Sequence, residues 1–241
     1  MSPVPVNKPR AKGTTVNHGL FVRGTLAALV IFVVLIALGS FSSREPVVKP
    51  PENSSNTPPY SAVIAYGTSY GAPNAPITLE IYSDFQCYFC QEFALGIQKQ
   101  LEATYVAEGK VRIVYKHRIG YGDESWLAAE ASECASEQNQ FWPYHDLLMQ
   151  LRLSSSKEDI SSEKLIDLAR QLGLNVDKFT ASLNSRKFST KVSQENDEGM
   201  NLGLTNIPKF YFNGVVANDS IGDSFQNFQK VIDAELARLG K

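Results

Sequence analysis

The sequence predicts an α/β fold in which a βαβ unit and a ββα unit flank an all-helical insertion, with one apolar helix ahead of the folded domain. A strand–helix–strand pattern runs from Ile77 to His117, and a strand–hairpin–helix pattern runs from Lys209 to the C-terminus. The residues between these patterns show helical periodicity and no clear strand. With 241 residues, of which 43% are hydrophobic and 20% charged, the chain has a globular composition and can form one well-packed core.

The segment ahead of the folded domain has the character of a membrane anchor. Residues 24–41 carry no charge, and as a helix these 18 residues would span about 27 Å, close to the hydrocarbon thickness of a bilayer. The tail before this segment contains no acidic residue, and its basic residues are Lys8, Arg10, Lys12 and Arg23. The positive-inside rule therefore predicts a cytoplasmic tail at residues 1–23, with everything after the apolar segment outside the cytoplasm.

A cleavable signal peptide is the alternative, since Ala37-Leu38-Gly39 has the small-x-small form of a cleavage site. The apolar run is longer than a usual signal core, which favours an uncleaved anchor in the cell membrane. After cleavage the protein would instead be periplasmic or secreted, so the folded part is exported in both cases. Residues 42–59 are rich in Pro, Ser and Asn and predict an extended linker, which leaves residues 60–241 for the folded domain.

The first half of that domain predicts a βαβ unit. Ala62–Tyr66 is a weak strand candidate, and a turn-rich segment separates it from a buried strand at Ile77–Tyr82. An amphipathic helix is expected from Cys90 to about Val106, and Val111–His117 alternates as a strand. This order predicts a parallel strand pair with a right-handed crossover.

A helical subdomain is expected from about residue 121 to 203, because one crossover helix cannot use so many residues. Its helices are expected at Trp126–Leu151, Ser162–Leu172, Val176–Leu183 and Phe188–Leu202. Trp126 is expected on the core-facing side of the first of these helices. The sequence then predicts a ββα unit made of a strand at Lys209–Phe212, the turn Asn213-Gly214, a second strand at Val215-Val216 and a helix at Ser224–Leu239.

Cys87-Tyr88-Phe89-Cys90 carries the chemistry that the sequence predicts. The motif stands between a buried strand and a helix start, where Cys87 would face unsatisfied backbone N–H groups and the positive end of the helix dipole. That setting favours the thiolate, which is the attacking species in disulfide exchange. We therefore expect a redox pair in which Cys87 is the exposed member and Cys90 is buried.

Three other interpretations of the cysteines were weighed. A four-cysteine zinc site lacks a second pair, and a mixed metal site would have to recruit His117 or His145, neither of which shows metal-ligand spacing. A structural bridge across so small a loop would give little stabilisation. Cys134, the odd cysteine, is expected to be a buried, unreactive thiol, with regulatory pairing to another chain as the alternative.

These elements together resemble the thioredoxin arrangement, and with a helical insertion between the halves they resemble the DsbA family. The motifs that carry the likeness are Gly71-Ala72-Pro73-Asn74-Ala75-Pro76, Tyr82-Ser83-Asp84-Phe85-Gln86-Cys87-Tyr88-Phe89-Cys90, Ala131-Ser132-Glu133-Cys134-Ala135, Phe141-Trp142-Pro143-Tyr144-His145 and Gly203-Leu204-Thr205-Asn206-Ile207-Pro208-Lys209-Phe210. The resemblance implies that Pro208 is cis and packs against the cysteine pair. It leaves the backbone groups of Ile207 free to pair with an extended substrate.

The resemblance also implies the reaction and its partners. The chain is expected to introduce disulfides into exported cysteine-containing polypeptides and to be reoxidised by a quinone-linked membrane oxidase, without a metal or organic cofactor. A monomer is expected, and a net charge of −2 gives no electrostatic reason for a nucleic-acid partner. The alternatives are a reductase or isomerase of the same fold fed by a membrane electron donor, or a non-enzymatic module that binds metal or unfolded chains.

Two departures from the family pattern bear on the mechanism. Many members carry a buried Glu where this chain has Ile81, and strand alternation points the neighbouring Glu80 to the opposite face. The dipeptide Tyr88-Phe89 supplies no charge between the cysteines, so we expect a Cys87 pKa that is less depressed than in members with a His there. The two rings should form an apolar rim suited to unfolded polypeptide, while Asp84 is expected to cap the turn before the motif.

Overall fold

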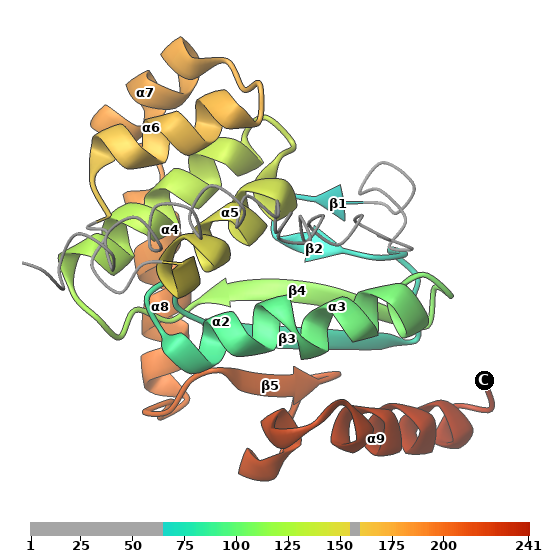
Figure 1. Ribbon diagram of the computed structural model, residues 1–241. Helices are drawn as coiled ribbons and strands as arrows, with labels where there is room; N and C mark the ends of the chain where they lie inside the picture. Colours follow the sequence, from blue (N-terminus) through green and yellow to red (C-terminus); the bar gives the residue numbers. More distant parts are fainter. Residues whose placement is uncertain (1–64, 155–159) are drawn as a thin grey trace, which may run out of the picture. The chain divides into compact units, whose positions relative to one another are not determined.

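The computed structural model describes residues 65–154 and 160–241 (Figure 1). The predicted anchor at 24–41, the linker at 42–59 and the first residues of the earliest strand candidate lie outside the described residues. Within the described part of the chain, no helix is both long enough and apolar enough to cross a membrane. The strands among these described residues form one six-stranded sheet in the order β1-β2-β4-β3-β5-β6.

The centre of the sheet confirms the predicted parallel pair. Strand β3 (Ile77–Ser83) runs parallel to β4 (Val111–His117), in a register that places Ser83 opposite His117. In β4 the side chains at alternate positions are buried, as its sequence period predicts, whereas in β3 the last three residues, Ile81, Tyr82 and Ser83, are all buried. The active-site motif therefore follows the carboxyl end of the central strand.

The outer strands differ on the two sides of this pair. On one side β1 (Ala65–Tyr66) and β2 (Ser69–Tyr70) form a short hairpin that pairs antiparallel with β4. Strand β2 was not expected, because its two residues stand within a segment rich in Gly and Pro. On the other side β5 (Lys209–Phe212) pairs antiparallel with β3, and β6 (Val215–Val216) pairs with β5.

The helix after the cysteines begins earlier than expected and is interrupted. It consists of α2 (Tyr88–Leu95), α3 (Ile97–Leu101) and a π-helical turn at Glu102–Val106. Cys87 is the N-cap residue of α2, and Gly96 breaks the ladder with φ −111° and ψ −85°. The predicted single helix from Cys90 was wrong on both points, because periodicity alone does not show a local break at a glycine.

The C-terminal unit confirms the predicted ββα order. The peptide bond between Ile207 and Pro208 is cis, directly before β5. After a 3₁₀ turn at Asp219–Asp223, the helix α9 (Phe225–Arg238) begins at its cap Ser224. The rings of Phe93, Phe210 and Phe228 meet with centroids 4.6 to 5.5 Å apart, so α2, β5 and α9 share one core layer.

The insertion is helical throughout its described residues. Its helices are α4 (Asp123–Ser136), α5 (Phe141–Ser154), α6 (Ser162–Gln171), α7 (Val176–Asn184) and α8 (Ser189–Asn201). The expected helix at Trp126–Leu151 is therefore two helices, separated at Asn139, whose φ is +59°. The later three confirm the prediction to within a residue or two, and α6 begins after its cap Ser161, whose side chain accepts from the Lys164 N–H.

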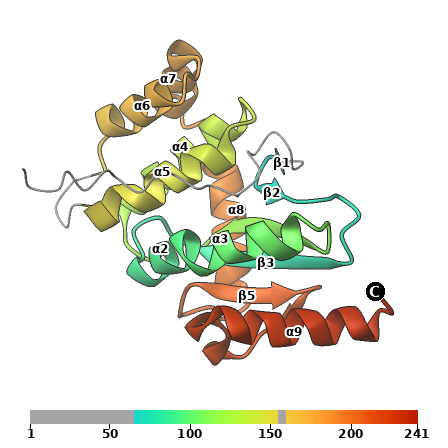
Figure 2. The same ribbon diagram turned by 45° about the vertical axis from the view of Figure 1, so that its right-hand side comes forward.

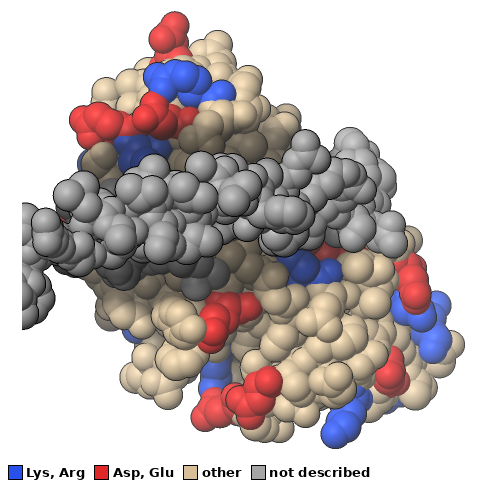
Figure 3. Space-filling view, viewed as in Figure 1, with Lys and Arg blue, Asp and Glu red and all other residues tan. Residues whose placement is uncertain are grey.

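The helices lie on opposite faces of the sheet (Figure 2). Helices α2, α3 and α9 cover one face, and α8 runs behind β3 and β4 on the other. Side chains from the back of both strands meet α8, since the Tyr82 hydroxyl and the Lys116 ammonium bind Glu198 at 2.8 and 3.0 Å. On the face of the molecule in Figure 3, acidic and basic side chains are interspersed over the described surface.

Candidate active site

The two cysteines sit where strand β3 gives way to helix α2. The Asp84 carbonyl accepts from the Cys87 backbone N–H at 3.2 Å, and the Asp84 carboxylate accepts from the Gln86 N–H at 2.7 Å. These bonds close the turn and confirm Asp84 as its cap. The backbone N–H of Cys90 lies 3.4 Å from the Cys87 sulfur, so the first turn of the helix donates toward that sulfur.

The environment makes the two thiols unequal. A hydrogen bond from the Cys90 side chain, the largest influence, lowers the pKa of Cys87 to about 7 against the effect of burial, with help from the Cys90 N–H. Burial raises the pKa of Cys90 well above its ordinary value. Near neutral pH the Cys87 thiol therefore ionises while Cys90 keeps its proton. Both cysteines are free thiols in this structure.

The expectation that Cys87 is exposed was wrong. Its relative exposure is 1%, hardly more than that of Cys90. The Cys87 thiol donates to the Ile207 carbonyl oxygen at 3.5 Å, and the Tyr121 side chain is among the groups that lower the Cys87 pKa. The cis-proline loop, which is distant in sequence, thus closes over Cys87.

Ile207 and Pro208 line a groove beside the cysteines. The cavity has a volume of about 440 Å³. Its apolar lining includes Phe89, Phe93, Ile97, Ile207, Pro208 and Phe210. Phe89 is 66% exposed and stands at its edge. Tyr88 is 55% exposed and does not line this groove, and its hydroxyl donates to Glu92 at 2.6 Å.

A polar network ties the active-site turn to the insertion, and sequence reasoning missed it. The second Asp84 oxygen accepts from the Gly120 N–H at 2.7 Å, and the first also accepts from the Ser125 hydroxyl. Gln86 donates to that hydroxyl at 3.0 Å and to the Tyr121 carbonyl at 3.5 Å. The only sequence signal was a set of polar residues just before an apolar motif, and it did not reveal partners more than thirty positions away.

Glu80 lies on the face of β3 opposite the cysteines, as strand alternation predicted. Its neighbour Ile81 is buried in the core below α2, whereas Glu80 is partly exposed. Glu80 acts electrostatically on Tyr82 and Lys116, which both face α8. The strand therefore places the aliphatic side chain of Ile81, not a carboxylate, on the face that carries the cysteines.

The two buried histidines pair with carboxylates. His117 Nε2 lies 3.0 Å from Glu133 Oε1, and His145 Nδ1 lies 3.0 Å from Asp146 Oδ1. His117, Glu133 and Glu195 have ligand atoms within 4.8 Å of one another, a spacing that a metal ion could use. The Lys191 ammonium already contacts Glu133 there, however, so this cluster carries its own cation.

Cys134 is buried on α4, which confirms the expected burial. Burial raises the pKa of this thiol to about 12, with the nearby acidic side chains adding to the effect. A thiol that is both covered and hard to ionise is a poor partner for exchange.

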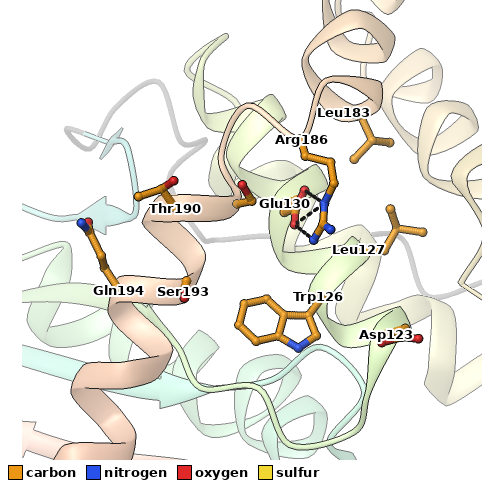
Figure 4. A pocket seen from close by; sticks show the side chains of 10 residues that line it. Asp123, Trp126, Leu127, Glu130, Leu183, Arg186, Thr190, Ser193 and Gln194 are labelled. Carbon is orange, nitrogen blue, oxygen red and sulfur yellow. Dashed lines mark hydrogen bonds and ion pairs between the residues drawn. The ribbon is translucent and has the colours of Figure 1, made fainter.

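A second cavity lies away from the cysteines, between α4 and the α7–α8 connection (Figure 4). Its volume is about 850 Å³, and an ion pair from Arg186 to Glu130, 2.7 Å between Nη2 and Oε1, stands along its wall. Trp126, expected in the core, is only partly buried and lines this cavity instead.

Known proteins with similar sequences and structures agree with this arrangement of the site. A thioredoxin family profile matches residues 65–234. The chain belongs to the thioredoxin family. The probable disulfide bond formation protein D of Bacillus anthracis is 29% identical over 182 residues, which cover 73% of this chain and 82% of that protein.

Solved structures of this thioredoxin family show the same fold. BdbD from Bacillus subtilis, in its oxidised form, superposes with a TM-score of 0.66 at 22% identity, over 75% of this chain and 96% of that one. The α-DsbA1 protein of Wolbachia pipientis gives a TM-score of 0.63 at 22% identity, over 71% and 91%. The chain is thus a DsbA-like member of the family and a protein-disulfide oxidoreductase.

Proposed function

We propose that this oxidoreductase works through a Cys87–Cys90 redox pair and introduces disulfides into exported polypeptides. The observation that carries the proposal is the asymmetry of the pair at the start of α2. Cys87 has a pKa of about 7 and lies 3.5 Å from the Ile207 carbonyl, whereas burial holds the Cys90 pKa high. The Cys87 sulfur is therefore suited to be attacked and to leave as a thiolate, and the Cys90 sulfur is suited to close the disulfide.

The exchange proceeds in two steps. A client thiolate attacks Cys87, the 87–90 sulfur–sulfur bond breaks, and Cys90 leaves with the electron pair and takes up a proton. A second client thiolate then attacks the client sulfur of the mixed disulfide, and Cys87 leaves as a thiolate. The client loses two electrons and gains a disulfide, while the enzyme gains two electrons and becomes a dithiol. A low pKa at Cys87 favours the second step, because a weaker base leaves faster.

The groove beside the pair suits an extended client segment. Its lining combines apolar side chains with polar ones, among them Asn218, Asp219 and Asp223. In this proposal the backbone of Ile207 pairs with the client, while Pro208 and Phe89 contact its side chains. Tyr88 contributes to the exposed apolar rim and not to the groove itself.

The cellular setting of the proposal comes from the sequence. Residues 24–41 would anchor the domain in the membrane with the cysteines outside the cytoplasm. Turnover requires an oxidant that removes two electrons from the dithiol, and a quinone-linked membrane oxidase has that chemistry. The names of the Bacillus relatives, disulfide bond formation proteins, support the oxidising direction.

The reduction potential of the 87–90 pair tests the direction of exchange. The reduced and oxidised forms would be quantified after equilibration in graded thiol–disulfide buffers. A potential between about −120 and −180 mV would make the protein a donor of disulfides. A potential near −270 mV would make it a reductant, and the absence of any reversible transition would remove the redox role of the pair.

A further inference from the structure

A smaller cavity adjoins the groove beside the cysteines, and Arg118 lines it. The volume of this Arg118 cavity is about 390 Å³. Phe89, Asn206 and Ile207 line both the cavity and the groove, so these residues form the border between the two. The Cys87 thiol donates to the carbonyl of one of them, Ile207, at 3.5 Å. A client segment attached at Cys87 therefore has the groove in one direction and the Arg118 cavity in the other.

Neutral acceptors hold the Arg118 side chain in place. Its Nε donates to the Leu204 carbonyl at 3.0 Å, and its Nη1 donates to the Ile119 carbonyl at 2.6 Å and to the Asn196 side chain at 3.3 Å. Gly199 on α8 lets the aliphatic stem pass close to the helix, since a Cβ there would lie 2.8 Å from Arg118 Cδ. The guanidinium is thus fixed before any ligand arrives, which lowers the entropic cost of binding a carboxylate.

The charge of Arg118 has no carboxylate partner within the described part of the chain. There it forms no ion pair, and its Nη2 makes no hydrogen bond. Glu198 on α8 binds the Lys116 ammonium at 3.0 Å instead. The buried Asp84 carboxylate accepts from the N–H of Gly120, a residue that lines the same cavity, and from two other donors. The cavity next to the cysteine pair thus presents a cation whose charge is available to a ligand.

The groove on the other side of the border has the opposite charge character. Its charged lining residues are Glu92, Lys209, Asp219 and Asp223. Lys209 is already paired with Asp219, so the acidic groups of the groove outnumber the basic ones. A client segment that reaches both sides would meet carboxylates in one direction and the Arg118 guanidinium in the other.

We infer that Arg118 is a specificity-determining residue, which binds an acidic side chain of the client close to the client cysteine that attacks Cys87. The inference rests on the proposed function, because it requires the client to be attached at Cys87. An Asp or Glu on the cavity side pairs with the guanidinium, whereas the same residue on the groove side meets like charge. The preferred clients therefore carry an acidic residue on one side of the reacting cysteine and not on the other.

Short peptides with a single cysteine test this preference. They carry Glu or Gln either two residues before or two residues after the cysteine, and the full chain in its oxidised form is the oxidant. Two peptide molecules reduce the 87–90 disulfide and leave as a peptide disulfide, so the rate follows the appearance of the enzyme dithiol. At low ionic strength Glu should react about threefold faster than Gln at one position only, the effect of a partly exposed ion pair. High salt should remove the difference.

Two variants separate the charge of Arg118 from its hydrogen bonds. Arg118→Gln should abolish the preference for Glu, and Arg118→Lys, which keeps the charge, should retain most of it. The intrinsic reactivity of the peptide thiols cancels, because every protein is compared with the same peptides. Lys110→Gln is the matched control, since Lys110 directly precedes β4 and Arg118 directly follows it. This variant removes the same charge at the opposite end of the strand and should leave the preference unchanged.

Three results would overturn the inference and leave the redox pair in place. The first is a preference for Glu that persists in Arg118→Gln, and the second is an equal effect of Glu at the two peptide positions. The third is a loss of preference in Arg118→Lys as complete as in Arg118→Gln, which would give Arg118 a purely structural role. Peptides that fail to reduce the 87–90 disulfide at all would instead contradict the proposed function itself.

Discussion

Cys87 and Cys90 are chemically identical side chains with opposite acidities. The difference arises from position, because one sulfur caps α2 and receives its first N–H groups while the other is enclosed behind it. The spacing of the motif in the sequence was sufficient to predict which cysteine would be activated. It was not sufficient to predict the burial of Cys87, since Ile207 reaches that sulfur from a loop that only the tertiary fold brings close.

The hydrogen bonds of Asp84 predict that this residue contributes to the stability of the fold. Its buried carboxylate accepts from Gln86, Gly120 and Ser125, so Asp84→Asn turns one acceptor oxygen into a donor that faces an N–H group. We expect the free energy of unfolding of the reduced protein to fall by about 2 kcal/mol, measured by urea denaturation. Asp197→Asn, at an exposed position on α8, is the control. Equal stability of the two variants would show that the network does not support the turn.

At the scale of elements, the sequence was most informative where a single period governs a whole segment. The central strands and helices α6, α7 and α8 follow the predicted bounds closely, because caps such as Ser161 and apolar alternation specify them locally. The breaks at Gly96 and Asn139 were missed. In each case helical residues continue on both sides, so only backbone conformation marks the interruption.

Helices α3 and α5 are joined by a buried polar contact that predicts a dependence on pH. Burial opposes ionisation of Asp146, but the His145 ring and the Lys99 ammonium, 3.0 and 2.7 Å away, outweigh it and lower the Asp146 pKa to about 2. Because the Asp146 pKa is lower in the folded state, the ionised carboxylate stabilises the folded protein at pH values above its ordinary pKa of 3.8. This contribution is lost as the pH falls toward 2.

The variant Asp146→Asn isolates this contribution. At pH 7 it should lower the free energy of unfolding by about 2 kcal/mol, the equivalent of the pKa shift. The difference from the unmutated protein should shrink as the pH falls below about 4, when denaturation curves are compared across that range. A difference that stays constant down to pH 2 would assign the effect to packing and not to charge.

For the molecule as a whole, the order of the βαβ and ββα halves and the inserted helices were predictable, since each half has its own pattern and motif. The linkage between insertion and active site was not, because it depends on side chains such as Ser125 that carry no periodic signal. The predicted anchor lies outside the described residues and stays a prediction. The 18 uncharged residues at 24–41 predict that the full chain sediments with membranes and that a chain beginning at Ser42 does not.

Membrane association can be checked by fractionation of cells that express either the full chain or the chain that begins at Ser42. The membrane fraction is washed with salt to remove loosely bound protein. Release of the full chain from cells, or its recovery in the supernatant, would contradict an uncleaved anchor. A shortened product that starts near residue 40 would support the signal-peptide alternative.

Trapping of the mixed disulfide tests the central claim most directly. The variant Cys90→Ser cannot form the 87–90 disulfide, so it is offered client that already carries a disulfide. The Cys87 thiolate attacks this disulfide and one client sulfur leaves as a thiolate, and the mixed disulfide should accumulate because no Cys90 thiol is present to resolve it. Mass spectrometry of the trapped species should place the client cysteine on Cys87. Two results would contradict the assignment of Cys87 as the exchanging cysteine. One is a complex attached at Cys134, and the other is that Cys90→Ser traps no complex beyond those that Cys87→Ser also traps.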